Sequence, residues 1–301
     1  MNWSATAPSN IALIKYMGKT DPSLNLPTNP SLSYTLNALT STVQLKKPSQ
    51  LHDAWYPMDN TLELSIKGQK RFLAHLNRLK KHFNYSGSFE LYSKNNFPLG
   101  CGLASSASSF AALTKCALKA LGELTSTPLL PLEKQAMLSR QGSGSSCRSF
   151  FSPWALWHDD IAKEISLPYH NLTHQVIVIS DKEKDVSSSL AHRLVTSSPY
   201  FEGRIERASL RLDNMVNALE KKAWSNTFEI CWEEFMDMHN LFQTAQTPFT
   251  YMNKACRELL NTLEKFWQIH SNGPLVTMDA GPNIHLLYRT EDNELKEKFY
   301  Y

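Results

Sequence analysis

Residues 98–121 constrain the fold more than any other segment, because a glycine-rich loop there opens into a long apolar pattern. After the loop, alanine, leucine and phenylalanine recur at helical spacing. A stripe of this kind predicts a buried helix that begins near Ser105. Gly122 stands at the end of the stripe, where a glycine C-cap is common. The fold therefore needs a core deep enough to bury a helix whose N-terminus meets an open loop.

The same loop is a candidate anion site. A helix N-terminus offers unpaired N–H groups and a partial positive charge, which suit a phosphate. Gly100 and Gly102 let the backbone approach an anion closely, and the hydroxyls of Ser105 and Ser106 can donate hydrogen bonds or ligate Mg²⁺. No GxxxxGK[ST] pattern occurs, so this is not a Walker A loop. A tight turn capped by serine is the other interpretation.

A second glycine pair lies in residues 141–148, which read QGSGSSCR. The chain has only 11 glycines among 301 residues, against about 21 at average usage. Placing Gly142 and Gly144 one residue apart in such a chain indicates a need for permissive backbone. The serines and Arg148 form a candidate cradle for phosphate or carboxylate, which arginine binds with two hydrogen bonds. A flexible surface loop is the alternative.

Lys15 interrupts an apolar run at 11–17 that is predicted to be a strand ending at Gly18. Burying a lysine charge without a partner is costly, so Lys15 either snorkels to solvent or faces a site. Asp279 lies in a turn-type loop between two apolar segments and is a candidate base or charge partner, or a simple turn aspartate.

Composition excludes several classes of protein. Hydrophobic residues make up 42% and charged residues 20% of the chain, as in an ordinary globular protein. A net charge of +3 is too small to indicate nucleic acid, and no apolar run is long enough to span a membrane. Five unpaired cysteines indicate a reducing compartment, and no secretory signal is visible, so a cytoplasmic protein is expected.

Length predicts two domains, with the boundary placed near Thr173 and the domains at 1–172 and 173–301. Both read as α+β. Strands are predicted at 11–17, 32–36, 62–66, 89–91, 176–179, 275–278 and 284–288, the segment 32–36 half-buried and 176–179 buried on both faces. Helices are predicted around 72–83, 105–121 and 130–140, and throughout 203–270.

Other reactive side chains do not cluster. His170 and His174 have helical zinc-ligand spacing but no acidic or cysteine partner, so solvated surface is expected there and no protein metal site is predicted. Cys101 lies inside the first glycine loop, and packing is expected of it rather than thiol chemistry.

Taken together, six segments resemble the mevalonate diphosphate decarboxylases, a branch of the GHMP kinase superfamily. They are APSNIALIKYMGK (7–19), LPTNPSLSYTL (26–36), NNFPLGCGLASSAS (95–108), RQGSGSSCRSF (140–150), DKEKDVSSS (181–189) and MDAGPN (278–283). They recur in the family's order across nearly the whole chain. The resemblance implies an N-terminal ribosomal S5 domain 2-like domain that binds ATP and a C-terminal ferredoxin-like α/β domain, with the site between them.

The resemblance also implies a reaction. ATP phosphorylates the tertiary 3-hydroxyl of mevalonate 5-diphosphate, and loss of phosphate and CO₂ then gives isopentenyl diphosphate. ATP and Mg²⁺ are the implied cofactors, and a homodimer that binds neither nucleic acid nor membrane is implied. Phosphorylation is needed because a tertiary alcohol is a poor leaving group.

Residue roles are carried over by position. Asp279 falls on the aspartate that acts on the 3-hydroxyl, Lys15 on the lysine beside it, Arg148 on the arginine that holds the carboxylate and Asn10 on a polar contact next to it. Tyr16, Lys19, Ser143, Ser145 and Ser188, together with Arg148, fall on substrate contacts. The ATP phosphate loop falls on Gly100, Gly102, Leu103, Ala104, Ser105 and Ser106, with Ser93 and Asn95 near the base or ribose.

The sequence also departs from the family pattern, at Met17, Pro30, Ser152-Pro153, Ala191-His192 and Gln243. These departures leave three alternatives open: a decarboxylase of mevalonate 5-phosphate, a GHMP small-molecule kinase, and a non-catalytic protein that binds nucleotide or isoprenoid. The joint presence of Lys15, Arg148 and Asp279 favours the diphosphate decarboxylase.

Overall fold

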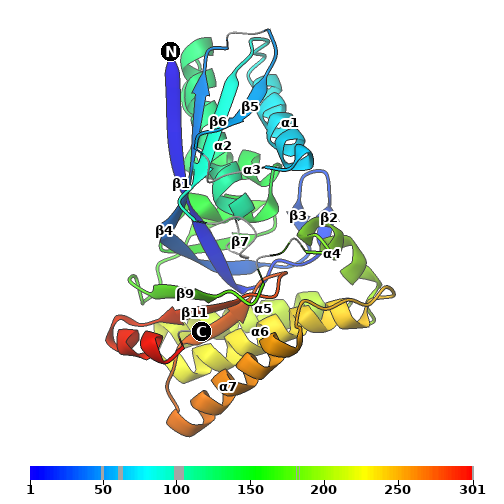
Figure 1. Ribbon diagram of the computed structural model, residues 1–301, viewed down its shortest axis with the longest axis vertical. Helices are drawn as coiled ribbons and strands as arrows, with labels where there is room; N and C mark the ends of the chain where they lie inside the picture. Colours follow the sequence, from blue (N-terminus) through cyan, green and yellow to red (C-terminus); the bar gives the residue numbers. More distant parts are fainter. Residues whose placement is uncertain (49–50, 60–63, 98–104, 181, 183, 300–301) are drawn as a thin grey trace.

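The computed structural model describes residues 1–48, 51–59, 64–97, 105–180, 182 and 184–299. Figure 1 shows a larger sheet with helices in the upper half of the molecule and a smaller sheet with long helices in the lower half. The larger sheet has the order β5-β6-β4-β7-β8, with β1 paired to β4. Its strands are β1 (Asn2–Ile14), β4 (Ser31–Lys46), β5 (Ala54–Pro57), β6 (Glu90–Asn95), β7 (Trp154–His158) and β8 (Ile161–Glu164).

The long antiparallel pair β1 and β4 connects the two halves. Their upper ends pack against the helices of the larger sheet, and their lower ends enter the hydrophobic core of the smaller one. The predicted strand at 11–17 is correct in part, since β1 begins at Asn2 and ends at Ile14. Lys15 consequently lies just beyond the strand, where its backbone is free to make other contacts.

β4 differs from its predicted half-buried pattern, because residues 31–36 are buried on both faces. The apolar members pack into the lower core, while Ser31 and Thr35 find polar partners on the other face. Thr35 Oγ1 donates to the carbonyl of Phe151 at 2.7 Å. Ser31 Oγ accepts from Arg148 Nη1 at 2.8 Å. The alternation of residue types therefore separates an apolar core from a polar site, and does not mark a solvent face.

Helices α1 (Ile66–His82), α2 (Ser105–Thr125) and α3 (Leu132–Arg140) accompany the larger sheet. The prediction that α2 begins at Ser105 is confirmed, and the helix is buried along most of its length. Its predicted end at Gly122 is wrong, because the helix continues for three residues to Thr125. Ser126 then takes a left-handed conformation at φ 53°, which is the geometry that the glycine was expected to supply.

The predicted strand at 62–66 is wrong where the structure describes it. Ile66 begins α1, because Ser65 caps the helix and its Oγ accepts from the backbone N–H of Gly68 at 3.2 Å. Residues 62 and 63 lie outside the described part of the chain. The hairpin of β7 and β8 was not predicted.

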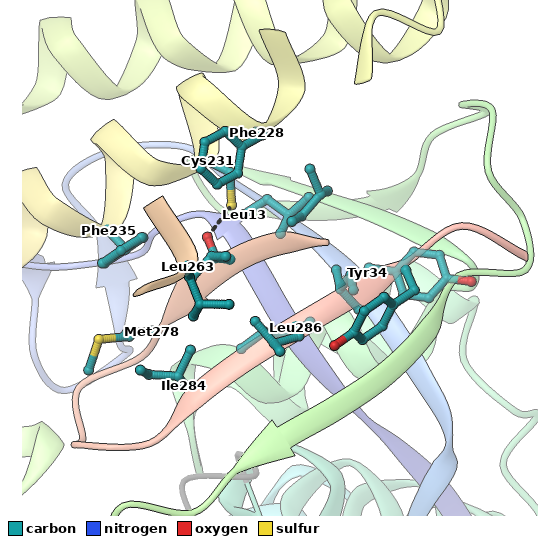
Figure 2. Packing of buried hydrophobic residues seen from close by; sticks show 14 of the residues in the cluster. Leu13, Tyr34, Phe228, Cys231, Phe235, Leu263, Met278, Ile284 and Leu286 are labelled. Carbon is teal, nitrogen blue, oxygen red and sulfur yellow. Dashed lines mark hydrogen bonds between the residues drawn. The ribbon is translucent and has the colours of Figure 1, made fainter. Parts of the chain in front are cut away.

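The smaller sheet has the order β10-β11-β9 and is covered by helices of the lower half. Its elements are β9 (Thr173–Ile177), β10 (Leu275–Met278) and β11 (Ile284–Tyr288), with α5 (Arg204–Glu220), α6 (Trp224–Thr244) and α7 (Lys254–His270). Figure 2 shows Leu13 and Tyr34 from the N-terminal strands in one core with Phe228 of α6 and Leu286 of β11. Hydrophobic burial thus joins the two halves.

The strand predicted at 176–179 is displaced and less buried than expected. β9 ends at Ile177, lies at the edge of its sheet, and leaves Val178 exposed. His174 lies on this strand and is half-buried, so its expected place on solvated surface is wrong. Its Nε2 lies 3.0 Å from Nδ1 of His285. His170 is exposed, as expected.

Two searches of the described residues bear on ligands and membranes. None of the helices found there has both the length and the apolar character needed to cross a bilayer. The same residues contain no group of three or more histidine, cysteine or acidic side chains arranged to hold a metal ion.

Candidate active site

A polar cleft of about 510 Å³ lies where the two halves of the chain meet. It is lined from the N-terminal part by residues that follow β1, by the start of α1, by the start of α2 and by the loop before and within the 3₁₀ helix η1 (Gly144–Phe150). The C-terminal part contributes the start of α4 (Ser188–Leu194), a face of α6 and the loop after β10. Segments far apart in the sequence therefore share one cavity.

Lys15 and Asp279 form an ion pair in this cleft. Lys15 Nζ donates to Asp279 Oδ1 at 2.7 Å, with the lysine side chain buried and the carboxylate about one-third exposed. Burial by itself raises the pKa of Asp279, but the nearby positive charge of Lys15 outweighs it and holds the pKa below its ordinary value. Asp279 is therefore an ionised carboxylate that faces the cavity, and the predicted pairing is confirmed.

Arg148 provides a second positive charge, and it is held by neutral groups. Its guanidinium is buried, with Nε donating to Asn10 Oδ1 at 3.3 Å and Nη1 donating to Ser31 Oγ at 2.8 Å. Its charge also lies 5.7 Å from the ring centre of Trp157. Burial lowers the pKa of Arg148 from its ordinary value. Among the described residues no carboxylate lies within ion-pair distance of it, so its charge remains available to an anionic ligand.

Asn10 orients Arg148 through both ends of its amide. While Oδ1 accepts from the guanidinium, Nδ2 donates to Ser149 Oγ at 2.8 Å and to the carbonyl of Ser145 at 3.2 Å. Asn10 does not line the cleft itself. The structure therefore places it behind the arginine, as a neighbouring polar contact.

Close packing, rather than flexibility, explains the second glycine pair. A Cβ on Gly142 would lie 2.2 Å from the Phe110 ring, and one on Gly144 would lie 2.6 Å from the Tyr16 ring. Both distances are shorter than side chains allow, so the segment is a tight cradle and not a loose surface loop. Tyr16 in turn packs against Trp157, with ring centres 4.6 Å apart. Burial raises the pKa of the Tyr16 hydroxyl, which stays protonated.

The remaining predicted substrate residues also belong to the lining of the cleft. Tyr16, Lys19, Ser143, Ser145 and Ser188 all line it. Lys19 Nζ donates to Asn25 Oδ1 at 2.6 Å, and burial together with Arg71 and Arg193 lowers its pKa. These residues therefore combine positive charge with several hydroxyls, a composition that suits a phosphate or diphosphate group.

The predicted ATP residues fall into three groups. Ser105 and Ser106 line the cleft at the start of α2, where Ser106 Oγ accepts from Ser143 Oγ at 3.2 Å. Ser93 and Asn95 are buried on β6 and are not among the cleft residues. Gly100, Gly102, Leu103 and Ala104 lie outside the described residues, as does Cys101.

Asn95 nevertheless has an unusual environment. Its Oδ1 accepts from Ser41 Oγ at 2.6 Å, while its buried Nδ2 has no hydrogen-bond partner among the described residues. A buried amide of this kind is rare without a ligand, a water molecule or a neighbouring loop. It points to a polar group at the end of β6, close to the start of the first glycine loop.

Several residues of the cleft were not found from the sequence. Arg71 and Lys67 reach it from α1, Lys184 from the segment before α4 and His192 from α4 itself. Lys184 Nζ donates to the carbonyl of Ala280, which follows Asp279 in the sequence, at 2.6 Å. A lysine or arginine on a solvated helix face carries no sequence signal that would separate it from any other surface charge.

His192 occupies one of the positions at which the sequence departs from the family pattern. Its ring stacks on Tyr16 with centres 4.4 Å apart, and its Nδ1 accepts from the backbone N–H of Gly18 at 3.0 Å. Burial lowers its pKa to about 3, so the ring is neutral at physiological pH. The departure therefore adds a neutral, fixed side chain beside Tyr16 in the lining of the cleft.

Comparison with known proteins identifies the family of the chain. Residues 7–167 match the family model described as the diphosphomevalonate decarboxylase-like N-terminal domain. Residues 175–298 match the mevalonate 5-diphosphate decarboxylase C-terminal domain. The chain belongs to the diphosphomevalonate decarboxylase family. It is accordingly an enzyme of mixed α/β fold, and both expectations from the sequence motifs are confirmed.

Relatives of this family match along nearly the whole chain. The diphosphomevalonate decarboxylase of Debaryomyces hansenii is 32% identical, over 97% of this chain and 80% of the relative. A crystal structure of a mevalonate diphosphate decarboxylase from Legionella pneumophila is 54% identical, with a TM-score of 0.94 over 99% of this chain and 96% of that one. A structure described as MDDEF in complex with MVAPP, AMPPCP and magnesium is 32% identical, with a TM-score of 0.86 over 99% and 92%.

Proposed function

We propose that the cleft binds mevalonate 5-diphosphate and ATP and converts them to isopentenyl diphosphate, ADP, phosphate and CO₂. The observation that carries this proposal is the buried Arg148, which has no carboxylate partner among the described residues and shares the cavity with the Lys15–Asp279 pair. A kinase needs only the Lys15–Asp279 pair and has no need of the arginine. A guanidinium reserved for an anion fits a substrate whose carboxylate must be held before it leaves as CO₂.

Asp279 acts on the 3-hydroxyl of the substrate in this proposal. Its carboxylate is ionised, and its exposed part faces the cavity, so it can accept the hydroxyl proton or orient the oxygen toward the γ-phosphate of ATP. Lys15 keeps the carboxylate anionic. The same ammonium group stabilises negative charge on the phosphoryl group during transfer.

Arg148 and its supports act in the second half of the reaction. As phosphate leaves C3, positive charge develops there, and the electrons of the breaking C–C bond form the new double bond while CO₂ departs. The guanidinium holds the carboxylate in place for this step, and Asn10 and Ser31 fix the guanidinium.

The 5-diphosphate of the substrate and the phosphates of ATP are assigned to different hydroxyl and basic residues of the cleft. Tyr16, Lys19, Ser143, Ser145 and Ser188 take the 5-diphosphate, and Ser105 and Ser106 at the start of α2 take the phosphates of ATP. Ser93, Asn95 and the loop 100–104 are assigned to the nucleotide; this is supported by Asn95 Nδ2, which has no hydrogen-bond partner in the part of the chain that the structure describes.

Mg²⁺ fits this cleft as an ion carried mainly by phosphates. The described cleft residues offer one carboxylate, Asp279, and the hydroxyls of Ser105 and Ser106, which is the sparse oxygen set that Mg²⁺ accepts alongside substrate phosphates. When bound, the ion neutralises charge on the β- and γ-phosphates. The complex of MDDEF with AMPPCP and magnesium supports this assignment.

A substrate panel tests the proposal. The protein is incubated with ATP, Mg²⁺ and mevalonate, its 5-phosphate or its 5-diphosphate, and release of CO₂ and of ADP is measured. Release of both with the 5-diphosphate is expected. ADP without CO₂ would indicate a kinase, equal turnover of the 5-phosphate would indicate the monophosphate decarboxylase, and binding without turnover would indicate a non-catalytic protein.

Three further properties belong to the proposal. We place the division between the domains at residues 172 and 173; the two family models end and begin on either side of it, which supports the division. We also propose a homodimer, on the family resemblance. A cytoplasmic location is proposed because the cysteines at 116, 147, 231 and 256 are free and buried. Sedimentation equilibrium of the purified chain tests the dimer.

A further inference from the structure

A buried ionic network lies directly behind the catalytic pair, and the reaction proposed above makes no use of it. Arg204 of α5 and Glu234 of α6 are both fully buried and form an ion pair through both carboxylate oxygens. Arg204 Nη1 also lies 2.9 Å from Asp237 Oδ2, and Arg211 Nη1 lies 3.0 Å from the same oxygen. Replacing such a pair by apolar residues is often neutral for stability, so stability alone does not explain the network.

The network holds the backbone of Lys15. The Lys15 N–H donates to Glu234 Oε1 at 2.9 Å, and the Lys15 carbonyl accepts from Arg204 Nη2 at 3.2 Å. Asn29 Nδ2 donates to the same carbonyl at 2.8 Å. Since β1 ends at Ile14, these side chains replace the strand partners that Lys15 lacks.

Helix α6, which carries Glu234, also holds the backbone of Asp279. His239 Nε2 lies 3.2 Å from the carbonyl oxygen of Asp279, which also accepts from the N–H of Gly281 at 2.8 Å. A carbonyl only accepts, so Nε2 carries the proton of this imidazole, whose pKa is lowered to about 3 by burial. The other ring nitrogen, Nδ1, is buried and has no partner among the described residues.

We propose that Glu234 and His239 are positioning residues, through which the single helix α6 fixes the backbone of both Lys15 and Asp279 and so keeps their side chains in contact. The inference rests on the catalytic roles proposed for that pair. His239 lies five positions after Glu234, which corresponds to about 7.5 Å along a helix axis. A rigid helix of this kind sets the distance between two loops that no strand pairing connects.

The decisive test compares two substitutions at one position. His239→Met keeps the volume but removes the N–H donor, and kcat is expected to fall about ten- to a hundredfold with KM nearly unchanged. His239→Gln places an amide N–H near the position of Nε2 and is expected to restore most of kcat. Unchanged kcat in His239→Met, or equal losses in both variants, would overturn the role of His239.

A pH profile separates positioning from general structural damage. The charged and titratable groups that face Asp279 are Lys15, Arg148, Lys184, His239 and His285. If His239→Met loosens the contact with Lys15, the pKa of Asp279 rises and the acid limb of kcat/KM moves to higher pH. An acid limb that stays in place would contradict the proposal.

The Glu234 contact is tested by removing its ion pair whole. The double variant Glu234→Met/Arg204→Met leaves no unpaired buried charge between these two residues, and Asp237 keeps Arg207 and Arg211 as partners. We expect Tm to be maintained and kcat to fall at least tenfold, because Lys15 loses two backbone contacts. Full kcat at an unchanged Tm would overturn the role of Glu234.

Asp237→Asn is the matched control. It removes charge from the same network but touches neither Lys15 nor Asp279, so Tm should fall while kcat stays within twofold of the wild-type enzyme. If the double variant does not fold, the two His239 variants decide the inference. Decarboxylation by the wild-type enzyme is measured first, so that failure of the proposed function is distinguished from failure of this inference.

Discussion

The cleft contains two buried positive charges, Lys15 and Arg148, whose surroundings differ; we call them its paired and its unpaired side. On one side Lys15 is paired with Asp279, and behind it lies a further network of ions. On the other side Arg148 is equally buried but is surrounded by an amide, a hydroxyl and an aromatic ring. The comparison teaches that one charge is used to tune a side chain of the protein, whereas the other is kept for a ligand.

The largest effect is expected on the paired side. Asp279→Asn preserves the size of the side chain but removes the negative charge and the base, and kcat should fall about a thousandfold. ATP affinity should change little, because the hydroxyls at the start of α2 are untouched. Steady-state CO₂ release and titration with a fluorescent ATP analogue measure the two quantities. Substantial turnover in this variant would remove Asp279 from the proposed role.

A somewhat smaller effect is expected on the unpaired side. Arg148→Ala removes the only group proposed to hold the substrate carboxylate, so kcat/KM for the 5-diphosphate should fall about a hundredfold, with changes in both kcat and KM. Arg148→Lys should recover only part of this loss, because an ammonium cannot make the paired contacts of a guanidinium. A normal kcat/KM in Arg148→Ala would move the carboxylate site elsewhere.

The pairing itself is tested by pH. In the wild-type enzyme the pKa of Asp279 lies below its ordinary value of 3.8, and His192 and His239 have pKa values of about 3, so none of the three should produce an inflection in kcat/KM near neutral pH. In Lys15→Met the burial of Asp279 is no longer opposed by that charge. Its pKa should therefore rise, and the acid limb of kcat/KM should move to higher pH.

Arg148→Met provides the contrast to Lys15→Met. Arg148 lowers the pKa of Asp279 less than Lys15 does. Its loss should therefore move the acid limb of kcat/KM less. Equal displacement in the two variants would mean that the two sides of the cleft do not differ in the way described above.

The smallest effect concerns the cradle that carries Arg148. Gly144→Ala would bring a Cβ to 2.6 Å from the Tyr16 ring, and such overpacking costs about 1–3 kcal/mol. Thermal denaturation should therefore show a Tm lower by a few degrees. Gly68→Ala is the control for stability, since its Cβ would meet only ordinary contacts of 3.5 Å or more within α1. An equal fall of Tm in both would contradict the packing argument.

Local patterns predicted the elements whose signal is local. The start of α2 at Ser105, the helical patterns of α1, α5, α6 and α7 and the strands β10 and β11 follow from hydrophobic period and caps. The predictions of secondary structure and burial were wrong where contacts with other residues decide the conformation or the environment of a segment. Ser65 caps a helix in a stretch that alternates like a strand, and residues 31–36 alternate between an apolar core and a buried polar face, where Ser31 contacts Arg148, rather than between core and solvent.

The residues of the site also differ in whether the sequence reveals them. Lys15 carried a signal because a lysine in an apolar run is costly, and Arg148 and Asp279 were identified through motifs that resemble a family. Glu234 and His239 carried none, because a charged or polar residue on an amphipathic helix is expected to face solvent. Their burial becomes visible only when α6 lies beneath the ends of β1 and β10.

The sequence by itself determined the buried helix after the first glycine loop, and its motifs identified the family and the three residues proposed for catalysis. Tertiary structure decided the rest: that the second glycine pair is a tight cradle, that Arg148 has only neutral supports among the described residues, and that α6 holds the backbone of Lys15 and Asp279. The reason is that covalent order encodes local conformation, whereas electrostatics and contact depend on distances that only the folded chain sets.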